Sequence, residues 1–238
     1  MHTFEDILVG RVKAMQTQTN SSVILAKLKS ALDSPSVVKI RCDPFETLVV
    51  TIISQNTADI NTARAFQNLS DRFPITPQAL ASAPVQELEA CLHVGGLYKS
   101  KAQTIQTASR IILEKFQGSL KYVLSLPLVQ TREMLMEMPG VGPKTADVVL
   151  LFSANQSTIP VDTHVNRVSK RLGLAPKDGG YEEVRLALQQ RFEPKDYLAV
   201  HLLLIALGRK FCKARRPLCV GCPVNSHCPS TDAGNRRG

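Results

Sequence analysis

The 238-residue sequence has no tryptophan, no low-complexity segment and no internal repeat of fixed period, so nothing in it indicates a disordered or repetitive architecture. No apolar run approaches the roughly 20 residues that a membrane-spanning helix needs. The opening segment MHTFEDILVG carries Glu5 and Asp6 where a secretory signal peptide would carry positive charge. These absences predict a globular, cytoplasmic protein with no targeting signal and no membrane partner.

Acidic residues are scarce relative to basic ones. The chain has 20 acidic against 29 basic residues, which gives a net charge of +9. Because a basic protein commonly binds a polyanion, we expect a nucleic acid partner, and an inert basic surface is the alternative. Hydrophobic residues make up 44% of the chain, enough for one large or two small domains with proper cores.

Cysteine is sparse along most of the chain and concentrated near its end. Cys42 and Cys91 stand alone, whereas the other four follow the pattern C-x6-C-x2-C-x5-C. In an intracellular protein such a group favours metal binding over disulfide bonds. Zinc sites usually contain two C-x2-4-C pairs and only one is present, so the spacing favours one wrapped cluster, with structural zinc as the alternative. The grouped cysteines are Cys212, Cys219, Cys222 and Cys228.

Helix signals recur along the whole chain. Asp43, with a proline after it and Glu46 three residues on, is typical of an N-cap that leads into the apolar run at 47–53. That run is rich in β-branched residues, but its cap and the lack of a partner strand favour a buried helix. No pair of strands is evident, so the predicted fold class is all-α. Further helices are expected at 56–73, 76–83, 84–94, 99–116, 131–138, 144–152, 163–174, 181–192 and 196–211.

The stretch MPGVGPKTADVVLLF, residues 138–152, places Lys144 at the start of an apolar helix, where a positive charge opposes the helix dipole. A nucleotide-binding phosphate loop is disfavoured, because Pro143 replaces its glycine, the glycine spacing is too short and a helix precedes the turn. What remains is a helix, a tight glycine hairpin and a helix. Gly140 and Gly142 can adopt positive φ, and the free N–H groups of the second helix can hold a DNA phosphate without reading sequence.

Residues 138–150, together with VDTHVNRV at 161–168, resemble the motifs of the helix-hairpin-helix DNA glycosylases, and specifically of the endonuclease III family. In that family the aspartate of V-D-T-H follows the hairpin lysine by eighteen residues, as Asp162 follows Lys144. The segments DPFETLVVTIISQNT and GGLYKSKAQTI and the terminal cysteines resemble other parts of the family, so the likeness covers nearly the whole chain. It implies two helical domains with a DNA-binding cleft between them. The expected domains are 37–157, a six-helix domain with the hairpin, and 1–36 plus 158–238, a cluster domain.

The resemblance implies a bifunctional DNA glycosylase and AP lyase of base excision repair. Such an enzyme, expected to be a monomer, removes damaged bases, here oxidised pyrimidines, from double-stranded DNA and nicks abasic sites by β-elimination. Lys144 would be the nucleophile, because the charged form of a partly buried amine at a helix N-terminus is disfavoured. Asp162 would stabilise positive charge on the sugar, although an aspartate at this place is also an ordinary helix N-cap. His164 is expected to be structural.

The resemblance also implies DNA contacts and a cofactor. Gln55 and Leu97 match the two positions that fill the gap left by the extruded nucleotide; the alternatives are a backbone cap for Gln55 and core packing for Leu97. The four grouped cysteines would bind a 4Fe-4S cluster, one thiolate each. The expected DNA-binding residues are Gln55, Leu97, Gly140 and Gly142, together with the phosphate-binding candidates Lys213, Arg215 and Arg216.

Two departures bear on substrate preference. The family's S-A-Q reads Ser54-Gln55 here, one residue shorter after the P-F-E segment, which leaves the shape of this loop and the preferred lesion open. The related adenine glycosylases carry a glutamate near 56–59, and none stands there, which argues against adenine removal. A mismatch-directed uracil or thymine glycosylase remains an alternative. A non-catalytic helix-hairpin-helix DNA-binding protein is the other, disfavoured because both Lys144 and Asp162 are present.

Overall fold

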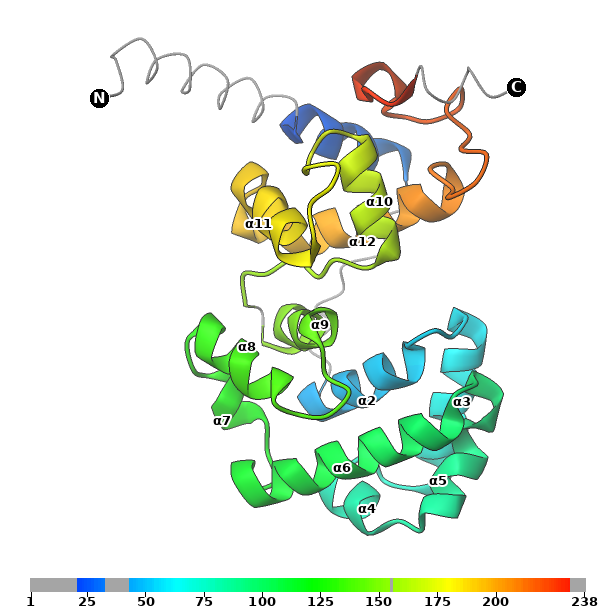
Figure 1. Ribbon diagram of the computed structural model, residues 1–238, viewed down its shortest axis with the longest axis vertical. Coiled ribbons are helices and arrows are strands. Elements are labelled where there is room, and N and C mark those ends of the chain that lie inside the picture. The colour runs from blue at the N-terminus through cyan, green and yellow to red at the C-terminus, as the bar shows by residue number, and fades with distance from the viewer. Residues whose placement is uncertain (1–20, 33–42, 155, 232–238) are drawn as a thin grey trace. The chain divides into compact units, whose positions relative to one another are not determined.

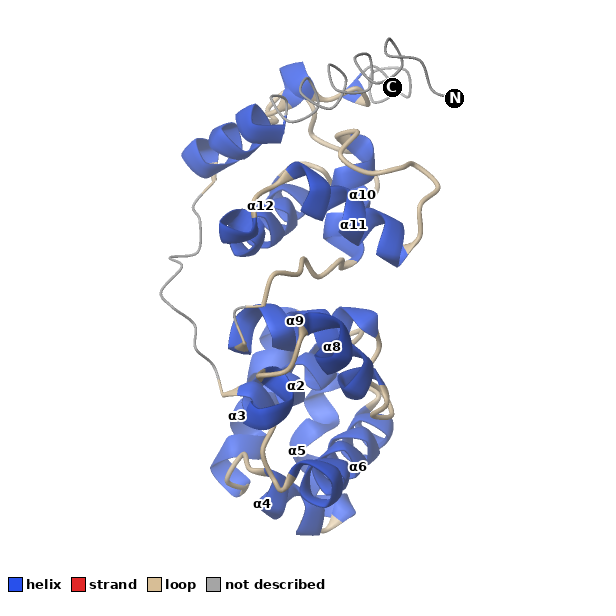
Figure 2. Ribbon diagram, turned by 90° about the vertical axis from the view of Figure 1, so that its left-hand side faces the viewer, coloured by secondary structure: helices blue, strands red, loops and turns tan. Residues whose placement is uncertain are grey.

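A computed structural model describes residues 21–32, 43–154 and 156–231 of the chain. These ranges contain helices and loops and no β-strand (Figure 2), so the predicted all-α class is confirmed. Contacts divide the chain into two compact units, Lys39–Ser157 and Met1–Val38 with Thr158–Gly238, and each unit is described by itself. The expected boundary at residue 37 and the lone Cys42 lie outside the described residues, so the limits of the expected domains stay predictions.

The unit Lys39–Ser157 is a helical assembly arranged around one long helix (Figure 1). Its long helix, α6, packs against α2, α4 and α5, and α2 also packs against α9. The pair α8 and α9 encloses the glycine hairpin. The helices are α2 (Pro44–Ser54), α3 (Asp59–Arg72), α4 (Pro77–Ser82), α5 (Val85–Leu92), the 3-10 turn η1 (His93–Gly95), α6 (Tyr98–Phe116), α7 (Lys121–Leu124), α8 (Leu128–Met136) and α9 (Pro143–Ser153).

Local sequence explains where these helices start. The Asp43 carboxylate accepts hydrogen bonds from the backbone N–H groups of Phe45 and Glu46, so the expected cap of α2 is present. Thr76 caps α4 in the same way, through Ala79 N. Such caps satisfy donors that a helix start would otherwise leave unpaired. The apolar faces then form one core, which includes the fully buried Leu48, Ile52, Leu69, Leu88, Ile105 and Ile112.

The second unit packs α10 (Thr163–Arg171) against both α11 (Tyr181–Arg191) and α12 (Tyr197–Lys210). Two 3-10 turns, η2 (Pro194–Asp196) and η3 (Asn225–His227), complete its described helical elements, together with a helical segment at 21–31. The contacts between that segment and the C-terminal helical elements include a hydrogen bond from Ser21 Oγ to Arg191 O over 2.9 Å and an ion pair of Lys29 with Asp196 over 2.7 Å. Among the described residues, no helix is long and apolar enough to cross a membrane.

Candidate functional site

The glycine hairpin joins α8 to α9 and depends on one of its two glycines. Gly140 has φ +78°, and a Cβ added there would lie 2.4 Å from Thr104 Cγ2 on α6. Gly142 does not have the positive φ that its sequence context suggested: its backbone is extended, at φ −87° and ψ 179°. The reason is Pro143, since a residue before proline is forced out of the helical region. A Cβ at Gly142 would meet nothing within 4 Å, so this side of the hairpin is open.

Lys144 occupies the first turn of α9, directly after Pro143. Its side chain is half-buried, and its neighbours Thr145 and Ala146 are buried. In the described structure no side chain caps this helix start, so the first N–H groups of α9 stay available to an anion. Lys144 therefore lies half-buried in the first turn of a helix, where the sequence placed it, and the structure adds a helix start with no side-chain cap beside an open hairpin.

Gln55 ends α2 and contacts the same hairpin. Its side-chain Nε2 donates to the carbonyl oxygen of Gly140 over 3.0 Å and to Thr145 Oγ1 over 3.4 Å. The next residue, Asn56, has a left-handed backbone with φ 52°. The Gln55 loop is thus attached to the residues on both sides of Lys144. The Gln55 side chain bonds to a distant backbone carbonyl in the hairpin, and its role in filling DNA stays a prediction.

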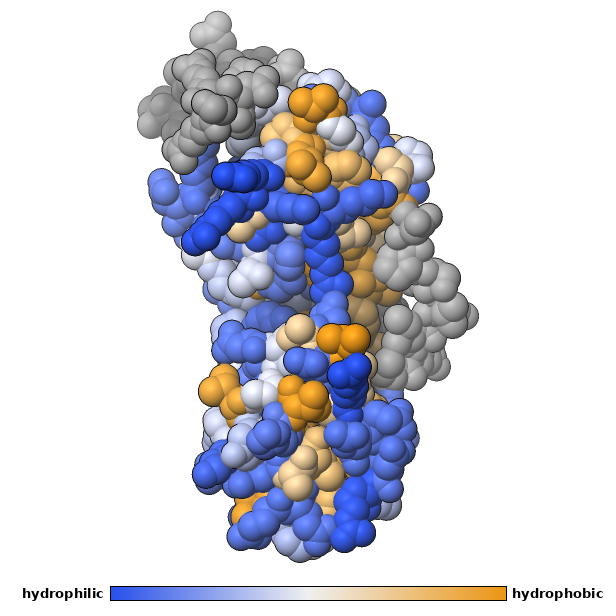
Figure 3. Space-filling view, turned by 90° about the vertical axis from the view of Figure 1, so that its right-hand side faces the viewer, coloured by the Kyte–Doolittle hydropathy of each residue, from blue (hydrophilic) through white to orange (hydrophobic). Residues whose placement is uncertain are grey.

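Leu97 lies at the start of α6 and is not a core residue. It is 62% exposed, and its backbone is left-handed, at φ 49° and ψ 26°. For a branched side chain this conformation costs about 1–2 kcal/mol. Figure 3 shows isolated hydrophobic groups among hydrophilic ones on one face of this unit. Its large exposed hydrophobic side chains in the described part are Ile60, Leu97, Tyr122 and Val129.

Asp162 belongs to the other unit and begins α10. Its Oδ1 accepts a hydrogen bond from Val165 N over 2.7 Å, so it is an N-cap. The segment before it is held from two sides: His201 Nδ1–H donates to Pro160 O over 2.9 Å, and Val161 N donates to the Tyr181 hydroxyl over 3.3 Å. A carboxylate fixed in this way has a defined orientation, and the cap occupies only one of its two oxygens in the bonds described.

His164 follows Asp162 closely and packs against the backbone of α12. A Cβ at Gly208 would lie 2.8 Å from His164 Nδ1, so the ring fills the space that this glycine leaves. The same nitrogen accepts a hydrogen bond from Arg167 Nη2 over 3.1 Å. Both contacts are internal to the unit, which agrees with the structural role expected for this histidine.

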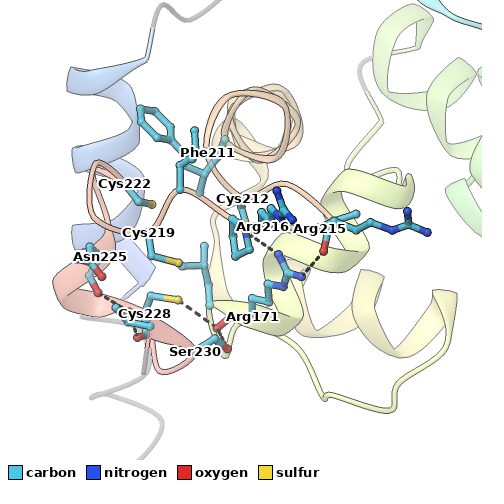
Figure 4. A pocket seen from close by; sticks show the side chains of 16 residues that line it. Arg171, Phe211, Cys212, Arg215, Arg216, Cys219, Cys222, Asn225, Cys228 and Ser230 are labelled. Atoms are coloured by element: carbon cyan, nitrogen blue, oxygen red, sulfur yellow. Dashed lines mark hydrogen bonds between the residues drawn. The ribbon is translucent and has the colours of Figure 1, made fainter. Parts of the chain in front are cut away.

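The four grouped cysteines line one cavity of about 520 Å³ in the unit that contains α10 and α12 (Figure 4). All four thiols are free and half-buried. Burial raises the pKa of Cys219 and of Cys222, and the negative charge of neighbouring thiolates raises both further. In the described ranges, no three His, Cys, Asp or Glu side chains lie close enough to share a single metal ion.

Arg171 holds both ends of the cysteine loop, a role that the sequence did not predict. Its guanidinium donates to Lys213 O over 2.7 Å, to Ala214 O over 3.1 Å and to Cys212 Sγ over 3.5 Å. Its own carbonyl accepts from Ser230 Oγ over 2.8 Å and from the Cys228 thiol over 3.4 Å. A basic residue in the last turn of α10 was the only signal, and it did not reveal these partners.

The three basic residues of the loop are exposed. Lys213, Arg215 and Arg216 face solvent, and Arg216 has a left-handed backbone at φ 51°. Figure 4 shows the Arg215 side chain extending away from the sulfurs of Cys219 and Cys228. These side chains are therefore available to phosphates, as the phosphate-binding prediction requires.

Comparisons with known proteins agree with this arrangement. Residues 49–194 match the model of the HhH-GPD superfamily of base excision DNA repair proteins. Endonuclease III of Sulfolobus acidocaldarius is 35% identical, over 77% of this chain and 81% of its own length. Endonuclease III of Thermotoga maritima is 37% identical, over 78% of this chain and 83% of its own length.

Solved structures extend the likeness to the whole fold. A non-covalent endonuclease III–DNA complex matches with a TM-score of 0.80 and 30% identity, over 92% of this chain and 99% of the other. A trapped covalent endonuclease III–DNA intermediate matches with a TM-score of 0.79 and 31% identity, over 91% and 97%. A thermostable thymine-DNA glycosylase, with a TM-score of 0.71 and 17% identity, shares the fold. The chain belongs to the endonuclease III family, within the HhH-GPD superfamily of base excision DNA repair proteins.

Proposed function

We propose that Lys144 is the nucleophile and Asp162 the electrostatic partner of this base excision repair DNA glycosylase and AP lyase, and that its substrates are oxidised pyrimidines and abasic sites in double-stranded DNA. The observation that supports the proposal most is the setting of Lys144. It lies half-buried in the first turn of α9, at an uncapped helix start beside an open hairpin. A helix N-terminus disfavours positive charge, and the neutral form of an amine is the nucleophile that this reaction needs.

The reaction begins when the Lys144 amine attacks C1′ of the damaged nucleotide. The Nζ–C1′ bond forms while the bond from C1′ to the base breaks, and the base leaves with the bonding electron pair. Loss of the amine protons and opening of the sugar ring give a Schiff base. Removal of a proton from C2′ then expels the 3′ phosphate oxygen, which nicks the strand. Water finally hydrolyses the remaining imine and frees Lys144.

Asp162 stabilises the positive charge that develops on the sugar as the base departs. Its carboxylate is oriented by the Val165 N–H and by the anchored segment before it. A negative group that is already fixed needs no reorganisation during the reaction, which is the condition for strong electrostatic stabilisation. The capping role and the catalytic role therefore support each other.

DNA is held and opened by separate groups. The open Gly140–Gly142 hairpin and the first N–H groups of α9 bind a phosphate, and the basic loop residues bind others without reading sequence. Leu97 and Gln55 fill the gap left by the extruded nucleotide. The exposure and the strained backbone of Leu97 support this use, because an exposed side chain in a strained conformation does not stabilise the core. The DNA-contacting basic residues proposed are Lys213, Arg215 and Arg216.

The cysteine cavity suits a 4Fe-4S cluster. It presents four thiols from one loop, and soft sulfur ligands of this number are those that such clusters use. A structural zinc ion can also take four cysteine thiolates, but its sites usually carry two C-x2-4-C pairs, and this loop has one. Cys212, Cys219, Cys222 and Cys228 would hold such a cluster, and its bonds to their sulfurs would cross-link this loop.

Borohydride trapping tests the proposal. On duplexes with an oxidised pyrimidine, borohydride should reduce the Schiff base and give a covalent protein–DNA adduct. Lys144→Gln should abolish trapping and nicking while DNA binding stays within a few fold, because one charge among many contributes modestly to affinity. Lys121→Gln, which removes an exposed charge from the same unit, is the matched control and should trap normally. If Lys144→Gln loses rate only in proportion to affinity, Lys144 merely binds phosphate.

A panel of duplexes, each with one lesion or mismatch, tests the substrate. Fastest release of oxidised pyrimidines supports the proposal. Fastest release of uracil or thymine from mismatches with guanine would contradict it and favour the mismatch-directed alternative.

A further inference from the structure

Lys101 is a buried lysine that lies between the two loops proposed to enter DNA. It is 4% exposed, although lysine is among the residues least often buried. Its Nζ donates to Thr57 Oγ1 over 2.5 Å and to the carbonyl oxygen of Gly95 over 3.1 Å. The Thr57 hydroxyl in turn donates to Gly95 O over 2.6 Å. These three groups form a closed triangle of hydrogen bonds.

The triangle connects segments that are distant in sequence. Thr57 stands two residues after Gln55, and Gly95 stands two residues before Leu97. Lys101 itself lies in the first turns of α6, the helix that Leu97 begins. Each loop is therefore anchored to the same rigid helix within two residues of its inserting side chain.

Burial of this ammonium group is unfavourable, and desolvation lowers the pKa of Lys101. Within the described part of the chain, Lys101 Nζ donates to a hydroxyl and to a carbonyl, both of which are neutral. A methionine of similar length would fill the same space without this cost. The ammonium N–H groups of Lys101 therefore fix the positions of the two loops and do not add to the stability of the core.

The strained backbone of Leu97 explains why this turn needs the hydrogen bonds of Lys101 and Thr57. Its left-handed backbone is strained, and such conformations persist only where the surroundings fix them from several sides. Gly95 O, two residues before the strained Leu97, receives two hydrogen bonds, one from Lys101 and one from Thr57. Those bonds hold the turn from which Leu97 projects.

We propose that Lys101 is a positioning residue that clamps the Gln55 loop to the Leu97 loop, so that both side chains enter the DNA as one rigid wedge. The inference rests on the insertion roles proposed above for Gln55 and Leu97. Lys101 acts on extrusion of the damaged nucleotide and not on the bond-breaking steps, because it contacts the wedge loops and neither Lys144 nor the hairpin in the bonds described. Without the clamp, the Gln55 loop and the Leu97 loop are no longer joined through Lys101.

The test compares two substrates under single-turnover conditions. Lys101→Met should slow base removal from a damaged duplex at least tenfold and nicking of a preformed abasic site less than threefold, because only the first requires extrusion of a stacked base. Thr57→Val breaks the same triangle with a smaller change and should show the same selectivity, and Thr57→Ser, which keeps the hydroxyl, should restore the rate. Lys121→Met controls for loss of one positive charge in this unit and should leave both rates unchanged.

A double-mutant cycle separates a clamp from a general structural role. If Lys101 acts through the wedge, Lys101→Met should slow base removal much less in a Leu97→Ala background than in the parent, so the two effects should not add. Full additivity, or equal loss on both substrates with Thr57→Val as well as Lys101→Met, would overturn the clamp. If Leu97→Ala alone slows both substrates equally, the wedge role itself fails; if Leu97→Ala is selective and Lys101→Met is not, the clamp alone fails.

Discussion

The side-chain amide of Gln55 donates a hydrogen bond to the carbonyl oxygen of Gly140, which attaches the end of α2 to the hairpin that precedes Lys144. The two residues are 85 positions apart in the chain. Gln55 therefore contributes to the shape of the hairpin in the free protein, in addition to its proposed role of filling the gap that the extruded nucleotide leaves in the DNA.

Replacement of Gln55 by leucine, which has a similar size, removes the donor and leaves the Gly140 carbonyl without this partner. We expect the free energy of unfolding to fall by about 0.5–1.5 kcal/mol, the usual contribution of one hydrogen bond. Urea denaturation measures this change. An unchanged free energy together with slower base removal would show that Gln55 matters for DNA alone.

The two hairpin glycines should respond differently to alanine. In Gly140→Ala the new Cβ overlaps Thr104 and the residue keeps a positive φ, so we expect destabilisation by more than about 1 kcal/mol. Gly142→Ala has neither problem and should change the unfolding free energy by less than about 0.5 kcal/mol. Its methyl group faces the open side of the hairpin, so its effect should appear in DNA affinity instead. Thermal unfolding and binding titrations distinguish the two variants, and equal destabilisation would contradict the geometry.

The double role of Asp162 can be divided by substitution. Asparagine is also a good N-cap, so Asp162→Asn should unfold at nearly the same denaturant concentration as the parent. It should nevertheless lose about two to four decades of single-turnover rate, because the negative charge is gone. Asp162→Ala should lose the rate and about 1 kcal/mol of stability as well. If the asparagine variant were fully active, Asp162 would have no electrostatic role in catalysis and would act only as the N-cap of α10.

Shortening of Leu97 should affect one substrate more than the other. Leu97→Ala removes most of the proposed wedge, so base removal from damaged duplexes should slow more than nicking of abasic sites, since unstacking costs a few kcal/mol only in the first case. The stability should not fall, because the side chain is exposed. Quenched-flow or gel assays on both substrates give the ratio, and a ratio of one would contradict the wedge.

Cluster binding predicts about four irons per chain and a brown colour. Cys219→Ser should give colourless or insoluble protein, whereas Cys91→Ser, which changes a cysteine of the other unit, should leave the colour intact. Iron and zinc analysis of protein purified without oxygen checks this prediction. Stoichiometric zinc would indicate the zinc alternative.

The sequence predicted the helices well because their signals are local. The Asp43 cap, the prolines and the glycine hairpin each act within a few residues, and the structure places helix ends near them. Gly142 was the exception, because the restriction imposed by Pro143 outweighed the freedom of glycine. Whether Leu97 lay in the core was left open by its sequence, since a single apolar residue after two glycines is compatible with either environment.

Long-range contacts could not be predicted in the same way. The Gln55–Gly140 and Arg171–Ala214 bonds join residues far apart in the chain, and nothing in either local sequence identifies the partner. Lys101 does have a signal in the sequence. It falls on the buried face of α6, where charged residues are rare, together with Ile105, Ser109 and Ile112. A charged residue on an apolar helix face is thus a signal worth following in other sequences.

The strained, exposed conformation of Leu97 sets a limit on how this protein can be made more robust. Glycine at position 97 would adopt φ 49° without strain and would remove an apolar side chain from the surface. A screen for thermal stability alone would therefore favour variants that have lost the residue proposed to enter DNA. This is the usual trade-off between the stability and the activity of an enzyme. Engineering of this enzyme should hold residue 97 constant and seek its gains elsewhere.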